Sequence, residues 1–196
     1  LYQNVCLNSY PAWSKKIQGS FLEDTQIMFD LRQRINRIII KLSYRFGVSR
    51  LRSMPKKLAI DPTNHCDLKC PLCPTGLGDK TVSRGLMKLD QFKPVIDHLG
   101  KWLQSVDMYS WGEPLLNKSF VEMIRYSATD HNIRTITSLH LNNLTDEQVE
   151  GFVTSGLDKL IVSVDGATQE VYEQYRVEGN IEKVFDNMKR LVNART

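Results

Sequence analysis

Three of the four cysteines lie within eight residues of one another, at Cys66, Cys70 and Cys73. Their spacing is C-x3-C-x2-C, so one short loop could present three thiolates to a single metal centre. Three thiolates can bind three irons of a cubane iron–sulfur cluster and leave the fourth iron without a protein ligand. An open coordination position is typical of catalytic metal centres rather than structural ones. The spacing therefore favours a catalytic iron–sulfur site.

A zinc site is the alternative for the same three cysteines, with His65 as a possible fourth ligand. Zinc modules usually combine two short cysteine pairs, and this sequence has no second C-x2-C pair. His65 directly precedes Cys66, which makes it difficult for both side chains to reach one ion. If zinc were bound, the chain would be a non-catalytic interaction module.

The elements that must position this loop alternate regularly between strand and helix from residue 57 onward. Apolar runs predict strands at 58–60, 106–109, 133–137 and 160–165, and helical spacing predicts helices at 90–99, 119–128, 145–153, 169–175 and 181–191. Asp90 and Thr145 are the expected N-caps, and Val149, Phe152 and Val153 are the expected buried face of the third helix. Strand–helix repeats predict a parallel sheet with right-handed crossovers. Four such units form either a small open α/β sheet or the first part of a barrel.

The motifs after the first two strands resemble the radical S-adenosylmethionine (SAM) superfamily. The cysteine motif follows the first strand, and the sequence WGEP at 111–114 follows the second, where family members carry a GGEP-like motif. The segment 160–168, together with Tyr175 and Arg176, is similar to members with a C-terminal SPASM or twitch auxiliary-cluster domain. The resemblance covers residues 57–196 and implies a partial parallel (β/α)6 TIM-like barrel. About the first four βα units of that barrel are present, preceded by an N-terminal helical extension.

The resemblance also implies the cofactors and the reaction. A 4Fe-4S cluster held by Cys66, Cys70 and Cys73 would bind S-adenosyl-L-methionine at its open iron. An electron donor of flavodoxin or ferredoxin type would drive reductive cleavage of SAM to a 5′-deoxyadenosyl radical. That radical would abstract hydrogen from a peptide or a small molecule. By position in the family motifs, six residues are assigned to SAM: Gly112, Glu113, Ser138, Ser163, Asp165 and Arg176.

Three histidines receive no role at this site. We expect His98, His131 and His140 at the surface or at helix ends. The segment 137–140 reads TSLH where many relatives read TNG, and Asp67 stands where asparagine is usual. Neither departure removes a predicted cluster ligand.

The N-terminal part of the chain differs from the rest, and we divide the chain into a basic, partly helical extension at 1–54 and a core at 55–196. A helix is predicted at 30–46, with Gly47 ending it. Residues 31–57 contain nine lysines and arginines and no acidic residue, whereas the whole chain carries +4. Such a stretch can contact nucleic acid or an anionic membrane. A solvated helix face, or packing against an acidic region, is the favoured interpretation, so we expect neither partner.

Composition gives the remaining expectations. The chain is 41% hydrophobic and 24% charged, as in ordinary globular domains. Its longest aliphatic runs, such as the one at 38–40, are far below the roughly 20 apolar residues of a membrane span. No signal peptide is visible and Cys6 stands alone, so we expect a cytoplasmic protein. Because the sequence starts at Leu1 and ends within a helical pattern, we also expect a longer protein, and the strand at 160–165 as an exposed sheet edge.

Overall fold

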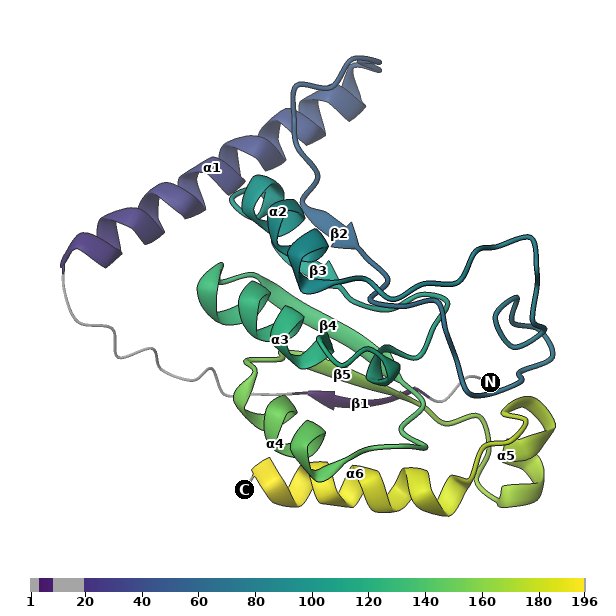
Figure 1. Cartoon of the computed structure of the whole chain (residues 1–196). Helices are drawn as coiled ribbons and strands as arrows, with labels where there is room; N and C mark the ends of the chain where they lie inside the picture. Colours follow the sequence, from purple (N-terminus) through teal and green to yellow (C-terminus); the bar gives the residue numbers. More distant parts are fainter. Residues whose placement is uncertain (1–3, 9–19, 196) are drawn as a thin grey trace.

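A computed structural model of the chain describes residues 4–8 and 20–195 and, of these, the side chains of residues 31–195 (Figure 1). A five-stranded sheet has the order β1-β5-β4-β3-β2. Four neighbouring strands are parallel: β2 (Lys57–Ala59), β3 (Ser105–Asp107), β4 (Arg134–Leu139) and β5 (Lys159–Ser163). The predicted α/β architecture of a partial parallel barrel is confirmed.

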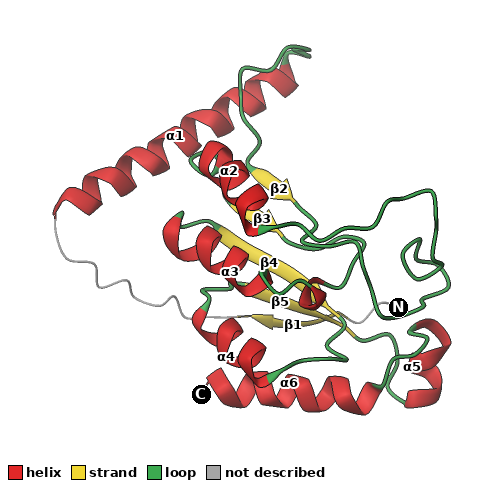
Figure 2. Ribbon diagram, viewed as in Figure 1, coloured by secondary structure: helices red, strands yellow, loops and turns green. Residues whose placement is uncertain are grey.

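Helices follow each parallel strand, and all lie along one face of the sheet except the short helix directly after β5, which lies beyond the strand ends (Figure 2). They are α2 (Leu89–Leu99), α3 (Phe120–Arg125), α4 (Asp146–Thr154), α5 (Gln169–Tyr175) and α6 (Ile181–Arg195). A 3-10 turn, η1 (Pro114–Leu116), precedes α3, and a π-helical turn, η2 (Tyr126–Asp130), extends it. This order matches the predicted strand–helix repeat.

The core lies between the sheet and these helices. Alternate residues of β5 are buried, namely Leu160 and Val162. The residues that follow each of them, Ile161 and Ser163, remain partly exposed. On the helix side, Phe92 and Ile96 of α2 are fully buried. The strand period of two therefore separates a helix-covered face from a more open face, as expected for strands whose side chains alternate.

Helix starts agree with the sequence in one case and differ in another. Thr145 caps α4 as predicted, and its side chain and that of Gln148 form a capping box. The prediction for Asp90 was wrong, because α2 begins one residue earlier, with Lys88 as N-cap and Asp90 within the first turn. Val153 was also assigned wrongly to the buried face of α4, since it is 37% exposed.

The edge of β5 is not free. β1 (Asn4–Asn8) pairs with β5 in antiparallel register, with Asn4 opposite Ser163 and Asn8 opposite Lys159. The expected exposed edge was therefore wrong, because a five-residue strand from the far end of the chain satisfies the backbone groups of β5. So short a strand carries little periodic signal, and its partner is remote in sequence.

The long helix α1 (Ser20–Arg45) precedes β2 and extends the predicted helix by ten residues toward the N-terminus. Gly47 follows it with a φ of +61°, a left-handed conformation that favours glycine at a helix end.

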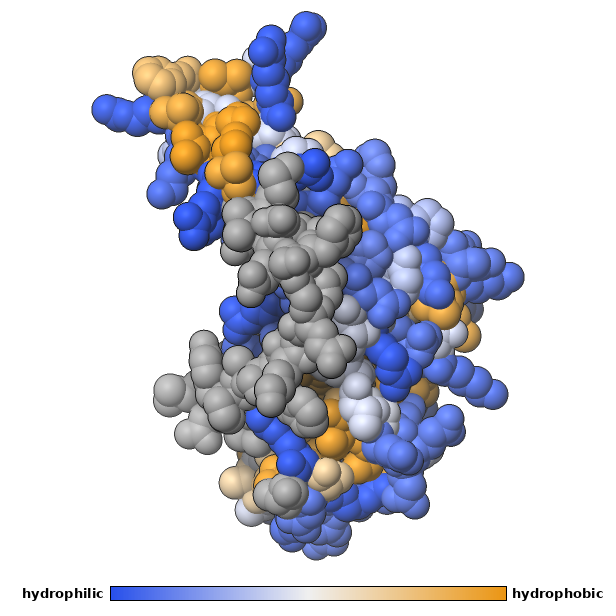
Figure 3. Space-filling view, turned by 90° about the vertical axis from the view of Figure 1, so that its left-hand side faces the viewer, coloured by the Kyte–Doolittle hydropathy of each residue, from blue (hydrophilic) through white to orange (hydrophobic). Residues whose placement is uncertain are grey.

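Hydrophobic side chains lie on the surface at the top of the molecule, over the C-terminal part of α1 (Figure 3). Among the described residues, no helix combines the length and the apolar composition needed to cross a bilayer. The division at residue 54 stays a prediction.

Candidate iron–sulfur and SAM site

The cysteine loop between β2 and α2 is closed at its base by its own hydrogen bonds. The hydroxyl of Thr63 donates to the carbonyl of Gly85 at 3.0 Å, and the side-chain amide of Asn64 donates to the carbonyl of Ser83 at 2.8 Å. Nη1 of Arg84 donates to the backbone carbonyl of Asn64 and to the hydroxyl of Thr75, at 2.8 and 2.9 Å. The loop is therefore held in shape by groups outside the cysteines.

The three cysteines differ in burial. Cys70 is 4% exposed, whereas Cys66 and Cys73 are partly exposed. The backbone N–H of Cys73 donates to the carbonyl of Cys70 at 3.2 Å, which forms a tight turn between two of the predicted ligands. Burial raises the pKa of the Cys70 thiol, the guanidinium of Arg176 opposes this rise, and the nearby thiols of Cys66 and Cys73 add to it. The three sulfurs therefore share one electrostatic environment on one loop.

Gly112 permits a close contact between the WGEP segment and the cysteine loop. A Cβ atom at this position would lie 2.0 Å from the carbonyl oxygen of Thr63 and 2.9 Å from that of His65. The next residue, Glu113, donates its backbone N–H to the carbonyl of His65 at 2.7 Å. The family motif assigns Gly112 to the binding of a ligand, SAM. In the structure, the chain's own backbone occupies that space.

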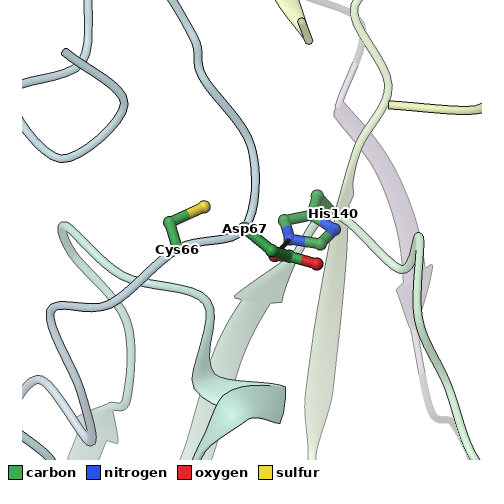
Figure 4. Close-up of side chains that lie close together, drawn as sticks. All are labelled: Cys66, Asp67 and His140. Carbon is green, nitrogen blue, oxygen red and sulfur yellow. Dashed lines mark hydrogen bonds and ion pairs between the residues drawn. The ribbon is translucent and has the colours of Figure 1, made fainter. Parts of the chain in front are cut away.

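His140 lies beside the first cysteine, together with Asp67 (Figure 4). One ligand atom from each of Cys66, Asp67 and His140 lies within 4.8 Å of the others. Nε2 of His140 is 2.8 Å from Oδ1 of Asp67 and 3.2 Å from Oε2 of Glu113. The side chain of Asn143 donates to the other oxygen of Asp67 at 2.6 Å. The cysteine loop, the WGEP segment and the end of β4 therefore meet at one imidazole.

The prediction that His140 lies at the surface was wrong, since it is 4% exposed. It follows β4 directly, and the next residue, Leu141, is fully buried with a φ of +55°. This sharp turn in a non-glycine residue is uncommon and marks a constrained site. The backbone N–H of Asn142 donates to Nδ1 of His140 at 3.1 Å and fixes the orientation of the ring.

The charges at this point influence one another strongly. Burial opposes the charged form of His140, but attraction by Glu113 and hydrogen bonding to Asp67 and Cys66 outweigh it and raise the pKa of His140. Burial raises the pKa of Glu113, and the neighbouring imidazole opposes that rise. The hydrogen bond with His140 lowers the pKa of Asp67 despite partial burial. The imidazole thus stabilises a carboxylate on the cysteine loop.

A second connection runs from the end of β5 to the buried cysteine. Nε of Arg176 donates to Oδ2 of Asp165 at 2.5 Å, and its Nη1 lies 3.9 Å from the sulfur of Cys70. The backbone N–H of Lys69 donates to the carbonyl of Val177 at 3.1 Å, so the segment after α5 runs along the cysteine loop. Two residues predicted for SAM, Asp165 and Arg176, are thus paired at the cysteines.

Ser138 and Ser163 form a separate pair on the open face of the sheet. Their hydroxyl oxygens lie 3.2 Å apart, from adjacent strands β4 and β5. Both side chains are partly exposed. The alternation of side chains along β5 places Ser163 on this face, opposite buried Leu160 and Val162.

Sequence reasoning missed Asp67 and His140. Both were visible as departures from the family pattern, Asp67 for asparagine and His140 in the segment after β4. An aspartate and a histidine can form a hydrogen bond, so the two departures considered together could have indicated a contact. Neither departure alone indicated one.

Comparison with known proteins gives a consistent result. Residues 60–196 match the radical SAM superfamily. An AdoMet-dependent heme synthase of Methanosarcina barkeri is 30% identical over 145 residues, which cover 74% of this chain and 41% of that protein. A probable GTP 3′,8-cyclase of Methanocaldococcus jannaschii is 27% identical over 139 residues, or 71% of this chain and 46% of that protein.

The fold also matches solved structures. SuiB of Streptococcus suis bound to S-adenosylmethionine superposes with a TM-score of 0.65 at 16% identity, covering 92% of this chain and 39% of that one. The chain thus spans less than half the length of the curated relatives it matches. The names of the two relatives refer to different reactions, so they do not single out a substrate.

Proposed function

Because the chain belongs to the radical SAM superfamily, whose enzymes use a 4Fe-4S cluster and SAM, we propose that Cys66, Cys70 and Cys73 hold that cluster. The observation that carries the proposal is the placement of three thiols on one hydrogen-bonded loop, with the arginine of a neighbouring segment 3.9 Å from the buried sulfur. When bound, the cluster and SAM supply reductive cleavage of SAM to a 5′-deoxyadenosyl radical. The chain's residues hold, orient and shield these groups.

The donor set fits a cluster better than the alternative zinc site. His65 is exposed, and its backbone carbonyl is taken by Glu113. His140 does approach Cys66, but Asp67 and Glu113 already occupy the Nε2 side of its ring. A histidine ligand that completes a Cys3His site is thus hard to supply, whereas three thiolates alone suffice for a cluster with one open iron.

We assign SAM to the groups at the C-terminal ends of the strands, where ligands bind in parallel α/β folds. Arg176 is suited to the SAM carboxylate, because a guanidinium pairs well with a carboxylate, and Asp165 holds it in place. Gly112 and Glu113 are candidates for the amino group, and Ser138 and Ser163 for the ribose. Glu113 also accepts backbone hydrogen bonds from Leu115 and His140 at 3.4 and 3.0 Å, so it orients its own segment.

We further assign a positioning role to Asp67 and His140. Their hydrogen bond fastens the residue after Cys66 to the end of β4, 73 positions later in the chain. Together with the contact between Glu113 and His65, it fixes the first cysteine against two strand ends. The peptide or small-molecule substrate, the electron donor of flavodoxin or ferredoxin type, the auxiliary-cluster branch and the cytoplasmic location remain predictions.

Anaerobic reconstitution with iron and sulfide tests the cluster assignment. We expect about four irons and four sulfides per chain and absorbance near about 400 nm. Single Cys→Ala changes at 66, 70 and 73 should each abolish most of both, while Cys6→Ala, the matched control, should not. Zinc at one equivalent with no sulfide would overturn the cluster in favour of the interaction module.

A further inference from the structure

Helix α1 turns a polar side toward the rest of the molecule. Asn36, 2% exposed, donates its side-chain amide to the carbonyl of Met54 at 2.8 Å and accepts from the backbone N–H of Met54 at 2.9 Å. Gln33 donates to the carbonyl of Leu103 at 2.7 Å, and Ser43 is buried. These bonds fix the rotation of the helix about its axis.

The opposite side of α1 is an apolar ridge in contact with solvent. Leu31, Ile35, Ile38 and Leu42 are 48–57% exposed, and Phe46, one turn further, is 75% exposed. Their spacing places them on one helix face. A helix of a globular domain normally buries such a face, so this outward orientation is the reverse of the usual one. Figure 3 shows hydrophobic side chains gathered at this end of the molecule, with hydrophilic ones at their border.

The apolar ridge is flanked by cations. Arg34, Lys41 and Arg45 lie along one border of it and are exposed. Of the nine basic residues at 31–57, only Lys57 has an ion-pair partner within residues 31–195, namely Asp107 at 2.6 Å. Charge and apolar area therefore lie side by side on a surface that the described part of the chain leaves open.

We propose that residues 31–46 of α1 lie on an anionic membrane surface, with the apolar ridge at the boundary between headgroups and acyl chains. An amphipathic helix with cations beside its apolar face binds in this way. Anionic lipid headgroups supply the charge complement that Arg34, Lys41 and Arg45 lack within residues 31–195. The basic stretch at 31–57, taken alone, is explained by a helix face in water. The second observation is that hydrogen bonds fix α1 with its apolar ridge outward, and the two observations together favour a membrane surface.

Other occupants explain less of this surface. Nucleic acid would neutralise the cations but would leave four aliphatic side chains in water. A second copy of the chain would bury the apolar ridge but would bring equal positive charges together. An acidic protein could supply both features, and the test below distinguishes it.

Co-sedimentation of the full 196-residue chain with vesicles tests the proposal. We expect binding to vesicles of equal parts phosphatidylcholine and phosphatidylglycerol, and little binding to phosphatidylcholine alone. The double change Ile35→Glu and Ile38→Glu should weaken binding by at least about tenfold. Arg34→Ala with Lys41→Ala should also weaken it by at least about tenfold, since each cation near such a surface contributes about fivefold. Val192→Glu, at an equally exposed valine of α6, is the matched control and should bind like the unchanged chain.

Three results would overturn the proposal. One is no binding to anionic vesicles at low salt, by protein whose far-ultraviolet circular dichroism shows intact folding; this result would leave an acidic protein as the occupant. Another is binding that the isoleucine changes leave intact, which indicates electrostatic attraction alone, as for nucleic acid. Size-exclusion chromatography with light scattering supplies a further contradiction if the unchanged chain is a dimer and the isoleucine variant a monomer.

Discussion

The Nε2 atom of His140 lies 2.8 Å from Oδ1 of Asp67, and this contact joins the cysteine loop to the end of β4. His140 is 4% exposed in its side chain and Asp67 is 29% exposed, so the pair lies at the inner border of the site. Because Glu113 meets the same nitrogen, one imidazole connects three segments that are far apart in sequence. The geometry of the first cysteine therefore depends on residues outside the cysteine motif.

We expect His140→Asn to lower the free energy of unfolding by about 3 kcal/mol, because buried Glu113 and partly buried Asp67 lose their shared partner. Urea denaturation of the cluster-free chain measures this. The chain offers a matched control in His131, which pairs with Asp97 at 3.0 Å where the side chains are 24% and 54% exposed. His131→Asn should cost about 1 kcal/mol or less. Equal losses in the two variants would contradict the special role of His140.

Gly112→Ala should destabilise the chain by at least about 2 kcal/mol, because the new methyl group would overlap the carbonyl of Thr63 and force backbone movement. Gly85→Ala, in the cysteine loop that faces Gly112, is the control, since a Cβ there meets nothing within 4 Å. It should change stability by no more than about 0.5 kcal/mol. If Gly112→Ala melts at the same temperature as Gly85→Ala, the close contact does not exist in solution.

The sequence predicted the parts of this fold that depend on local pattern. The strand–helix order from residue 57 follows from hydrophobic periodicity, and the N-cap at Thr145 follows from the residue type that opens the helix. The position of His140 could not be predicted in this way, because its partners Glu113 and Asp67 are 27 and 73 residues distant. The pairing of β1 with β5 is equally non-local. The outward rotation of α1 depends on the bonds of Asn36 and Gln33 to remote backbone groups.

Ser163→Ala should weaken SAM binding to the reconstituted protein by about fivefold, the effect of losing one neutral hydrogen bond. Ser138→Ala should weaken SAM binding by a similar factor. The loss of affinity in the double variant should be smaller than the product of the two single losses, because the two hydroxyl oxygens lie 3.2 Å apart and share one environment. Iron content should not change. Ser119→Ala is a suitable control, since Ser119 is partly exposed and makes no capping bond. Calorimetric titration with SAM measures all four variants, and unchanged affinity in both serine variants at the site would exclude the ribose assignment.

The reactivity of Cys70 should depend on pH through Arg176. Burial raises the pKa of the Cys70 thiol, so its thiolate forms at higher pH than in an ordinary cysteine, and Arg176 limits this rise. Removing the charge by Arg176→Gln should therefore move the midpoint of Cys70 alkylation to still higher pH, because alkylation requires the thiolate. Arg176→Lys keeps a positive charge and is the matched control, so its midpoint should stay nearer that of the unchanged chain. Iodoacetamide labelling of the cluster-free protein at a series of pH values, with mass spectrometry of the Cys70 peptide, gives the midpoint of alkylation separately from its limiting rate.

This separation matters because the shorter glutamine could also expose the sulfur of Cys70. Greater exposure would raise the limiting rate of alkylation without moving its midpoint to higher pH. A midpoint that falls in Arg176→Gln would show that the guanidinium does not stabilise the Cys70 thiolate.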